Sequence, residues 1–185
     1  MTANLLDGRA LSQKMKGELA QEVQGFLAQH GYAPTLTVLL VGEDPASQSY
    51  VKAINKACSD AGIGCNQIVL PATTTEGQLK AQLRQFNEDP RTSGVIVQMP
   101  LPKPLTQDMV TDVLSPDKDV DGICPANAGL LALGQEGFVP NTPTAGWPCS
   151  RAMALTWWVR GPWWWAGATS SASPWLFSSS RSTAP

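Results

Sequence analysis

The chain has 185 residues, a net charge of −2, and a composition that is 43% hydrophobic and 15% charged. This length allows one domain with a well-buried core and a further segment. The near-neutral charge argues against nucleic acid as a partner, because proteins that bind nucleic acids carry a strongly basic face. No run of about eighteen apolar residues predicts a transmembrane helix, and no secretory signal pattern opens the chain.

The four cysteines show neither a C-x-x-C pair nor a metal-ligand spacing. Isolated cysteines of this kind are typical of reduced thiols in the cytoplasm. We therefore expect a cytoplasmic protein with no membrane partner and no bound metal.

The composition changes sharply after Gly146. All seven tryptophans lie at or after Trp147, and all fifteen acidic residues lie at or before Glu136. Residues 1–146 contain ten basic and fifteen acidic residues, which gives a net charge of −5, whereas residues 147–185 contain three arginines and no acidic residue. The chain therefore combines two segments of different character.

The first elements follow from periodicity and from helix-end signals. Apolar residues recur every three or four positions in residues 11–31, which predicts an amphipathic helix. Residues 35–42 form a β-rich apolar run that predicts a buried strand. Asp44 and Pro45 supply an N-cap and a first-turn proline for a helix that stops at Gly62.

The same alternation continues along the chain. Residues 67–70 predict a second strand, and residues 73–76 resemble a capping box that opens a further helix. Residues 94–98 predict a third buried strand, and helices are expected over 106–114 and 128–133. Alternating strands and helices predict an α/β fold, a parallel sheet with helices on both faces.

In such sheets, ligands bind beyond the carboxyl ends of the strands, which directs attention to three segments. In the first, Tyr50 stands about two turns into a helix, where its ring can cover a flat ligand or be simply half-buried. In the second, Gln98 ends a strand and offers an amide to a ligand or to its own loop. In the third, residues 117–121 contain three acidic residues within five positions. This pattern is typical of a solvated loop, and its alternative is a metal site with too few ligands.

Taken in order, the motifs SxxYV, GVIVQMPLP, PDKDVDG and PNTP resemble one family, the bifunctional methylenetetrahydrofolate dehydrogenase/methenyltetrahydrofolate cyclohydrolases. The resemblance extends from about Leu5 to Gly146. It implies a folate site in a cleft between two α/β domains. It also implies oxidation of 5,10-methylenetetrahydrofolate with NADP, or sometimes NAD, and hydrolysis of the product to 10-formyltetrahydrofolate, within one-carbon metabolism and purine biosynthesis.

The resemblance also assigns roles to residues. Tyr50 is implied to stack on the folate, Gln98 to help orient a catalytic lysine, and Asp121 to hydrogen-bond the pterin. A carboxylate that faces two N–H donors makes a charge-assisted, bidentate contact, which suits Asp121 to that role. The substrate pocket is implied to be lined by Val97, Met99 and Pro100 as well.

The chain departs from the family pattern at the catalytic lysine. That lysine stands four residues after the tyrosine, and this position is Ile54 here. Lys52 and Lys56 each lie two positions away, a rotation of about 200° around a helix. Lys56 is the better substitute for the catalytic lysine, with a solvated surface charge as its alternative. Hydrolysis needs this group for proton transfer, so we expect the cyclohydrolase step to be impaired.

The segment after Gly146 lacks a glycine-rich phosphate loop and an acidic residue for a ribose. Tryptophan has a single codon, TGG, so the run 163–165, read one base earlier, encodes three valines. With permitted codons, residues 157–174 become VVGKRAVVVGRSNIVGKP, the strand, glycine-rich turn and helix start of a cofactor domain. We therefore predict that residues 147–185 are an out-of-frame remnant of a Rossmann NADP-binding domain, caused by a one-base deletion near codon 146.

These features predict two segments: residues 1–146 as a folate-binding catalytic domain and residues 147–185 as an irregular Trp/Ser-rich tail. Without the Rossmann domain we expect neither NADP binding, nor dehydrogenase activity, nor the family homodimer, which forms through that domain. A non-catalytic folate-binding module is the alternative function. A tail that binds membranes is the alternative for residues 147–185, although it has no basic helical face.

Overall fold

A computed structural model provides the structure of the chain, and it describes residues 7–141. Residues 14–120 form one compact unit, called here the central unit, and the residues on either side belong to a second, the flanking unit. The predicted out-of-frame segment, residues 147–185, lies outside the described residues. Among the described helices, none combines the length and apolar character needed to cross a membrane.

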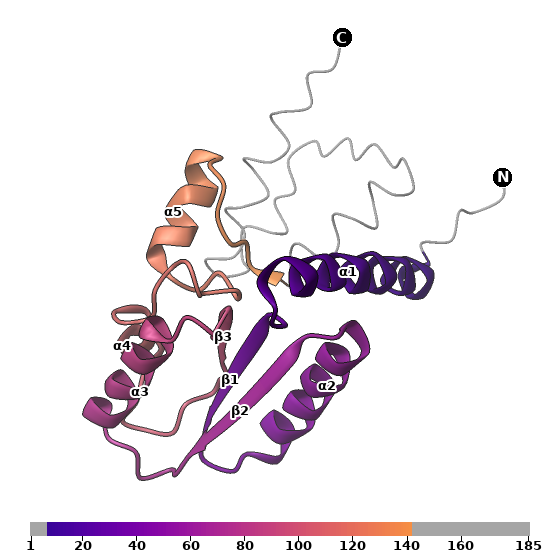
Figure 1. The fold of residues 1–185 in the computed structure, drawn as a ribbon. Coiled ribbons are helices and arrows are strands. Elements are labelled where there is room, and N and C mark those ends of the chain that lie inside the picture. The colour runs from indigo at the N-terminus through magenta and orange to yellow at the C-terminus, as the bar shows by residue number, and fades with distance from the viewer. Residues whose placement is uncertain (1–6, 142–185) are drawn as a thin grey trace, which may run out of the picture. The chain divides into compact units, whose positions relative to one another are not determined.

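A three-stranded parallel sheet forms the core of the central unit (Figure 1). Its strands are β1 (Thr35–Val41), β2 (Gly64–Leu70) and β3 (Gly94–Val97), in the order β2-β1-β3. Leu36 on β1 pairs with residues of both neighbours, in register with Cys65 and Gly94. The central strand is therefore covered along both edges, which explains why its sequence is a nearly continuous apolar run.

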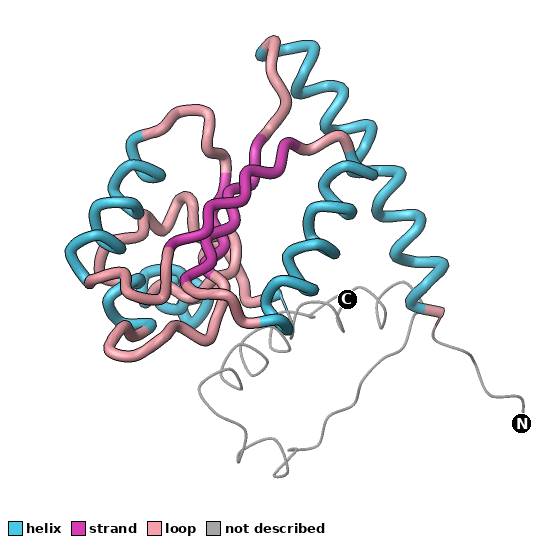
Figure 2. Tube along the Cα trace, turned by 90° about the horizontal axis from the view of Figure 1, so that it is seen from below, coloured by secondary structure: helices cyan, strands magenta, loops and turns pink. Residues whose placement is uncertain are grey.

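Helices cover both faces of this sheet, as the alternation predicts (Figure 2). They are α2 (Pro45–Ala61), α3 (Glu76–Glu88) and the short α4 (Gln107–Thr111); α1 (Gly8–His30), part of which falls in the central unit, lies beyond α2. The predicted α/β fold with a parallel sheet is confirmed.

The flanking unit contains α5 (Pro125–Leu133), which begins three residues before the predicted start at Ala128. Pro125 occupies the first turn, where its missing N–H costs no hydrogen bond. The helix ends at Gly134 in the left-handed conformation, with φ 64°.

Helix α2 begins and ends where the sequence predicts. Asp44 is its N-cap, and the Ser47 amide donates to the Asp44 carboxylate at 2.8 Å. Gly62 closes it in the left-handed conformation, with φ 77°. Both signals are local, which is why the sequence locates this helix correctly.

Two expectations need correction. The capping box of α3 is formed by Thr75 and Gln78, not by residues 73–76, because the third of three consecutive threonines serves as the N-cap. On α1, Val23 is buried, whereas Met15 and Leu19 of the predicted apolar stripe are 47% and 39% exposed. The period of the stripe predicts the helix correctly, but not how much of its apolar face is covered.

Candidate functional site

The carboxyl ends of β1 and β3 lie side by side in the central unit. Leu39 and Val97 are in register, and the backbone N–H of Gln98 donates to the Leu39 carbonyl at 2.8 Å. Gly42 follows β1 with φ 85°, and its amide donates to the Leu70 carbonyl at the end of β2 at 2.8 Å. The segments that lead to Tyr50 and Gln98 therefore start from one edge of the sheet, as predicted.

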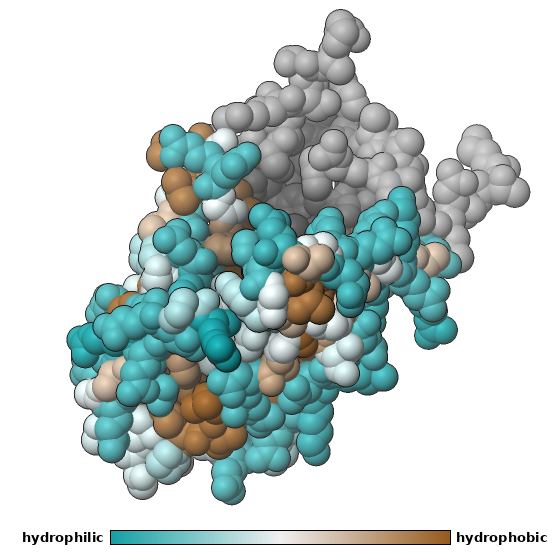
Figure 3. Space-filling view, in the orientation of Figure 1, coloured by the Kyte–Doolittle hydropathy of each residue, from teal (hydrophilic) through white to brown (hydrophobic). Residues whose placement is uncertain are grey.

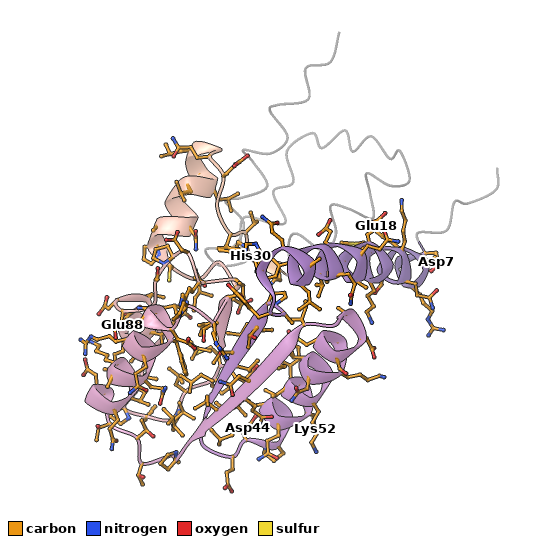
Figure 4. The ribbon with its side chains drawn as sticks, viewed as in Figure 1. Asp7, Glu18, His30, Asp44, Lys52 and Glu88 are labelled. Atoms are coloured by element: carbon orange, nitrogen blue, oxygen red, sulfur yellow. The ribbon has the colours of Figure 1, made fainter. Side chains whose placement is uncertain are left out.

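Tyr50 lies in the second turn of α2, and 58% of it is exposed. Asp44 and Lys52, on the same N-terminal half of this helix, are labelled in Figure 4. The Ser47 amide and hydroxyl lower the pKa of Asp44 below its ordinary value of 3.8 by hydrogen bonding its carboxylate. This anionic cap holds the start of the helix, and Tyr50 presents its ring to solvent one turn later.

Ile54 follows Tyr50 by one helical turn but belongs to the hydrophobic core. It is partly buried and packs against the buried cluster of Val38, Leu40 and Val51. The position at which the family resemblance places a lysine is therefore occupied by a side chain that stabilises the packing of α2 on the sheet.

The two neighbouring lysines lie on the solvent side of α2. Lys52 is exposed, and Lys56 pairs through its Nζ with Asp60 Oδ1 at 3.8 Å, with the Lys56 side chain 79% exposed. This pair is an ordinary (i, i+4) contact of an exposed helix surface. The geometry therefore favours the surface-charge interpretation of Lys56, and its catalytic role stays a prediction.

Gln98 stands at the end of β3, half-buried, after the buried Val97. Its Nε2 donates to the Met99 carbonyl at 2.9 Å, and the Met99–Pro100 peptide bond is cis. The structure thus shows the contact of Gln98 with its own loop, and its role toward a ligand stays a prediction.

Asp121 is the first residue of the flanking unit after the central unit ends. It is partly buried, and Asn141 Nδ2 donates to its Oδ1 at 3.1 Å. Asn141 belongs to the PNTP motif, for which the sequence alone predicts no role. The DVDG and PNTP motifs therefore meet through a side-chain hydrogen bond across twenty residues of sequence.

The acidic segment 117–121 is not a solvated loop. Asp119 is fully buried, and Lys118 Nζ donates to the carbonyls of Phe86 and Asp89, both at 2.6 Å. Among residues 7–141, no group of three His, Cys, Asp or Glu side chains is placed to hold a metal ion. The segment is held by hydrogen bonds to protein groups.

A shallow cavity of about 280 Å³ opens elsewhere in the central unit, between the end of β2 and α3. Leu70 and Pro71 form one wall, and Gln78 and Gln82 of α3 form another. In Figure 3, hydrophilic residues cover much of the visible surface of the described part, with apolar patches between them. Neither Tyr50 nor Gln98 lines this cavity, so it is separate from the predicted site.

Cys58 lies on the buried face of α2 and is a poor candidate for a nucleophile. Burial and the neighbouring Cys65 raise the pKa of the Cys58 thiol to about 11. At neutral pH the thiol is therefore protonated, and a protonated thiol is unreactive. Cys58 is therefore no candidate nucleophile, and the roles of Tyr50 and Gln98 stay predictions.

The comparisons with known proteins agree with the resemblance. The family model for the tetrahydrofolate dehydrogenase/cyclohydrolase catalytic domain matches residues 6–121. The bifunctional protein FolD of Chloroflexus aurantiacus is 43% identical over 161 residues, which cover 87% of this chain and 56% of that protein. The bifunctional protein FolD of Herpetosiphon aurantiacus is 44% identical over 146 residues, covering 79% and 51%.

Solved structures show the same similarity in three dimensions. The bifunctional FolD methylenetetrahydrofolate dehydrogenase/cyclohydrolase of Campylobacter jejuni superposes with a TM-score of 0.79 at 41% identity, covering 82% of this chain and 54% of that one. The Trypanosoma brucei dehydrogenase-cyclohydrolase, solved with NADP cofactor and an inhibitor, gives 0.76 at 29% identity, covering 83% and 53%. The chain thus spans about half the length of the relatives that it matches.

Proposed function

The chain belongs to the tetrahydrofolate dehydrogenase/cyclohydrolase family, and from that membership we propose that it binds folate substrates of one-carbon metabolism. The reactions proposed for the whole enzyme are oxidation of 5,10-methylenetetrahydrofolate and hydrolysis of the methenyl product to 10-formyltetrahydrofolate. The observation that supports this best is the family match over residues 6–121, which includes Tyr50, Gln98 and Asp121. The three free cysteines of the described part, Cys58, Cys65 and Cys124, suit the cytoplasm.

Within this proposal, the exposed ring of Tyr50 stacks on the flat pterin. Gln98 lines the substrate pocket with Val97, Met99 and Pro100, and its further role of orienting a catalytic lysine has no lysine at position 54 to act on, because that residue is Ile54. Asp121 accepts two N–H groups of the pterin, with Asn141 Nδ2 orienting its carboxylate. Each of these groups binds or orients the substrate.

NADP, which the family implies, does not fit the helix start that follows β1. A pyrophosphate needs free amides at a helix N-terminus. The helix that follows β1 is instead capped by the carboxylate of Asp44, which accepts the Ser47 amide and carries the wrong charge. We propose that this 185-residue chain lacks dehydrogenase activity, because residues 147–185, where the family pattern leads to a cofactor domain, contain no glycine-rich phosphate loop.

A non-catalytic folate-binding module is the second candidate, and Ile54 favours it. The residue that packs into the core at this position has no group that transfers a proton. Such a module would keep the contacts of Tyr50 and Asp121 and bind folate without hydrolysing it.

A titration with 5,10-methenyltetrahydrofolate tests the proposal. We expect the chain to bind it, and Tyr50→Ala to weaken binding by at least tenfold, because the stacking surface is lost. Tyr32→Ala is the matched control, since Tyr32 is also exposed, at 43%, and contacts the Phe26 and His30 rings instead. Absence of binding by the unmodified chain would refute both candidates, and equal effects of the two substitutions would refute the role of Tyr50.

A further inference from the structure

The end of α3 is tied to the segment that follows α4. Asn87 Nδ2 donates to the Val113 carbonyl at 2.7 Å, and the Ser115 amide donates back to Asn87 Oδ1 at 2.9 Å. One side chain thus satisfies both a carbonyl and an amide of a segment 26 and 28 residues away. Neutral hydrogen bonds of this kind hold a loop in one conformation without relying on charge.

Lys118 makes the second connection and joins two elements at once. Its ammonium donates to the Phe86 and Asp89 carbonyls at the C-terminus of α3, where a positive charge is favourable. Its own carbonyl accepts the Val95 amide of β3 at 2.7 Å. Lys118 is therefore anchored to α3 by its side chain and to β3 by its backbone.

The residues after Lys118 pack closely on the start of β3. Asp119 pairs with Val95 in a parallel bridge. A Cβ atom added to Gly94 would lie only 2.4 Å from Cγ1 of Val120, so a glycine is needed beneath that side chain. These contacts fix residues 118–120 against α3 and β3. The next residue in the chain is Asp121.

We propose that Lys118 is a positioning residue for Asp121: its hydrogen bonds to the end of α3 fix the backbone from which the folate-binding carboxylate projects. This inference rests on the proposed function. Consecutive Cα atoms are about 3.8 Å apart, so a segment held at residues 118–120 leaves the backbone of Asp121 little freedom to move. A carboxylate that must face two donors at once tolerates little misplacement.

Three variants of Lys118 and one control test this role. Lys118→Met removes the ammonium and keeps the length, Lys118→Gln keeps a shorter donor, and Lys118→Arg keeps the charge and the donors. Thr75→Ala is the control, because it removes the N-cap of the same helix at its opposite end and leaves the 113–120 segment untouched. Binding of 5,10-methenyltetrahydrofolate and amide hydrogen exchange of Val95 are measured on each full-length variant.

We expect Lys118→Met to weaken folate binding by about tenfold and to speed exchange of the Val95 amide, with Gln intermediate and Arg close to the unmodified chain. Thr75→Ala should lower the melting temperature without changing either readout. Equal folate affinity in Lys118→Met and Thr75→Ala overturns the positioning role. If the unmodified chain binds no folate, the proposed function fails, and Val95 exchange decides the anchor by itself: unchanged exchange in Lys118→Met overturns it.

Discussion

Tyr50 and Ile54 lie one helical turn apart on α2 in opposite environments: Tyr50 is 58% exposed, and Ile54 packs against the core of the sheet. Side chains four residues apart project from the same side of a helix. A lysine at position 54 would therefore start from the partly buried position that Ile54 now fills. Its stem can cover the apolar surface while its ammonium extends toward the ring of Tyr50. The chain thus keeps the four-residue spacing of the tyrosine–lysine pair, with Ile54 at the position of the lysine.

Ile54→Lys is predicted to raise the hydrolysis of 5,10-methenyltetrahydrofolate by at least a hundredfold, because a positioned acid–base group contributes about that much. The same change should lower the free energy of unfolding by about 1–3 kcal/mol, since an apolar contact with the core is lost. Loss of the methenyl absorbance and urea unfolding measure the two effects. Ile54→Met preserves the apolar packing and serves as the control. Unchanged hydrolysis in an Ile54→Lys chain that binds folate would contradict the proposed site.

Asp44→Ala is predicted to lower the melting temperature at neutral pH, because the amides at the start of α2 lose their acceptor. The pKa of Asp44 is lower in the folded chain than its ordinary value of 3.8, chiefly through hydrogen bonds from Ser47. Its stabilising contribution is therefore present above that value and is lost as the pH falls through the lower, folded pKa. The difference in melting temperature between the two chains should shrink as the pH falls below about 4. Asp60→Asn, on the exposed end of α2, is the control, and a difference independent of pH would refute the prediction.

Gly122→Ala is predicted to destabilise the chain by about 1–3 kcal/mol. Gly122 has φ 66°, and an added Cβ would lie 2.8 Å from the Pro140 nitrogen. The substitution should also separate Asp121 from Asn141 and weaken folate binding. Gly129→Ala is the control, because Gly129 lies inside α5 and an added Cβ would meet no atom within 4 Å. That change should stabilise the helix by about 0.5–1 kcal/mol, and equal effects of the two alanines in thermal unfolding would be the contrary result.

Insertion of one base near codon 146 is predicted to restore NADP binding and dehydrogenase activity. The reason is that, with permitted codons, the shifted frame encodes a glycine-rich turn before a helix, which is a site for a pyrophosphate. NADPH formation with 5,10-methylenetetrahydrofolate measures the outcome, with the unmodified 185-residue chain as the inactive control. Coding DNA whose codons do not fit the shifted frame would remove the basis of this prediction, and NADPH formation by the unmodified chain would contradict it.

The elements of the central unit could be predicted from sequence wherever the signal is local. The Asp44 cap, the stop at Gly62 and the apolar run of β1 each act within a few residues, and each appears at the predicted place. Element starts without such a signal were misplaced. β2 begins at Gly64 rather than residue 67, because pairing with Thr35 of β1 brings polar residues into the strand.

By itself, the sequence determined the α/β architecture, the family, the change in composition at Gly146 and the replacement of the expected lysine by Ile54. The tertiary structure alone decided that Ile54 is a core contact, that Lys118 anchors the 113–120 segment to α3, and that Asn141 holds Asp121. The physical reason is range. Caps and periodicities act within one or two helical turns, whereas Ile54 reaches Val38 and Leu40 of β1, Lys118 reaches α3, and Asn141 reaches Asp121, each at least fourteen positions away, and only the folded chain brings such residues together.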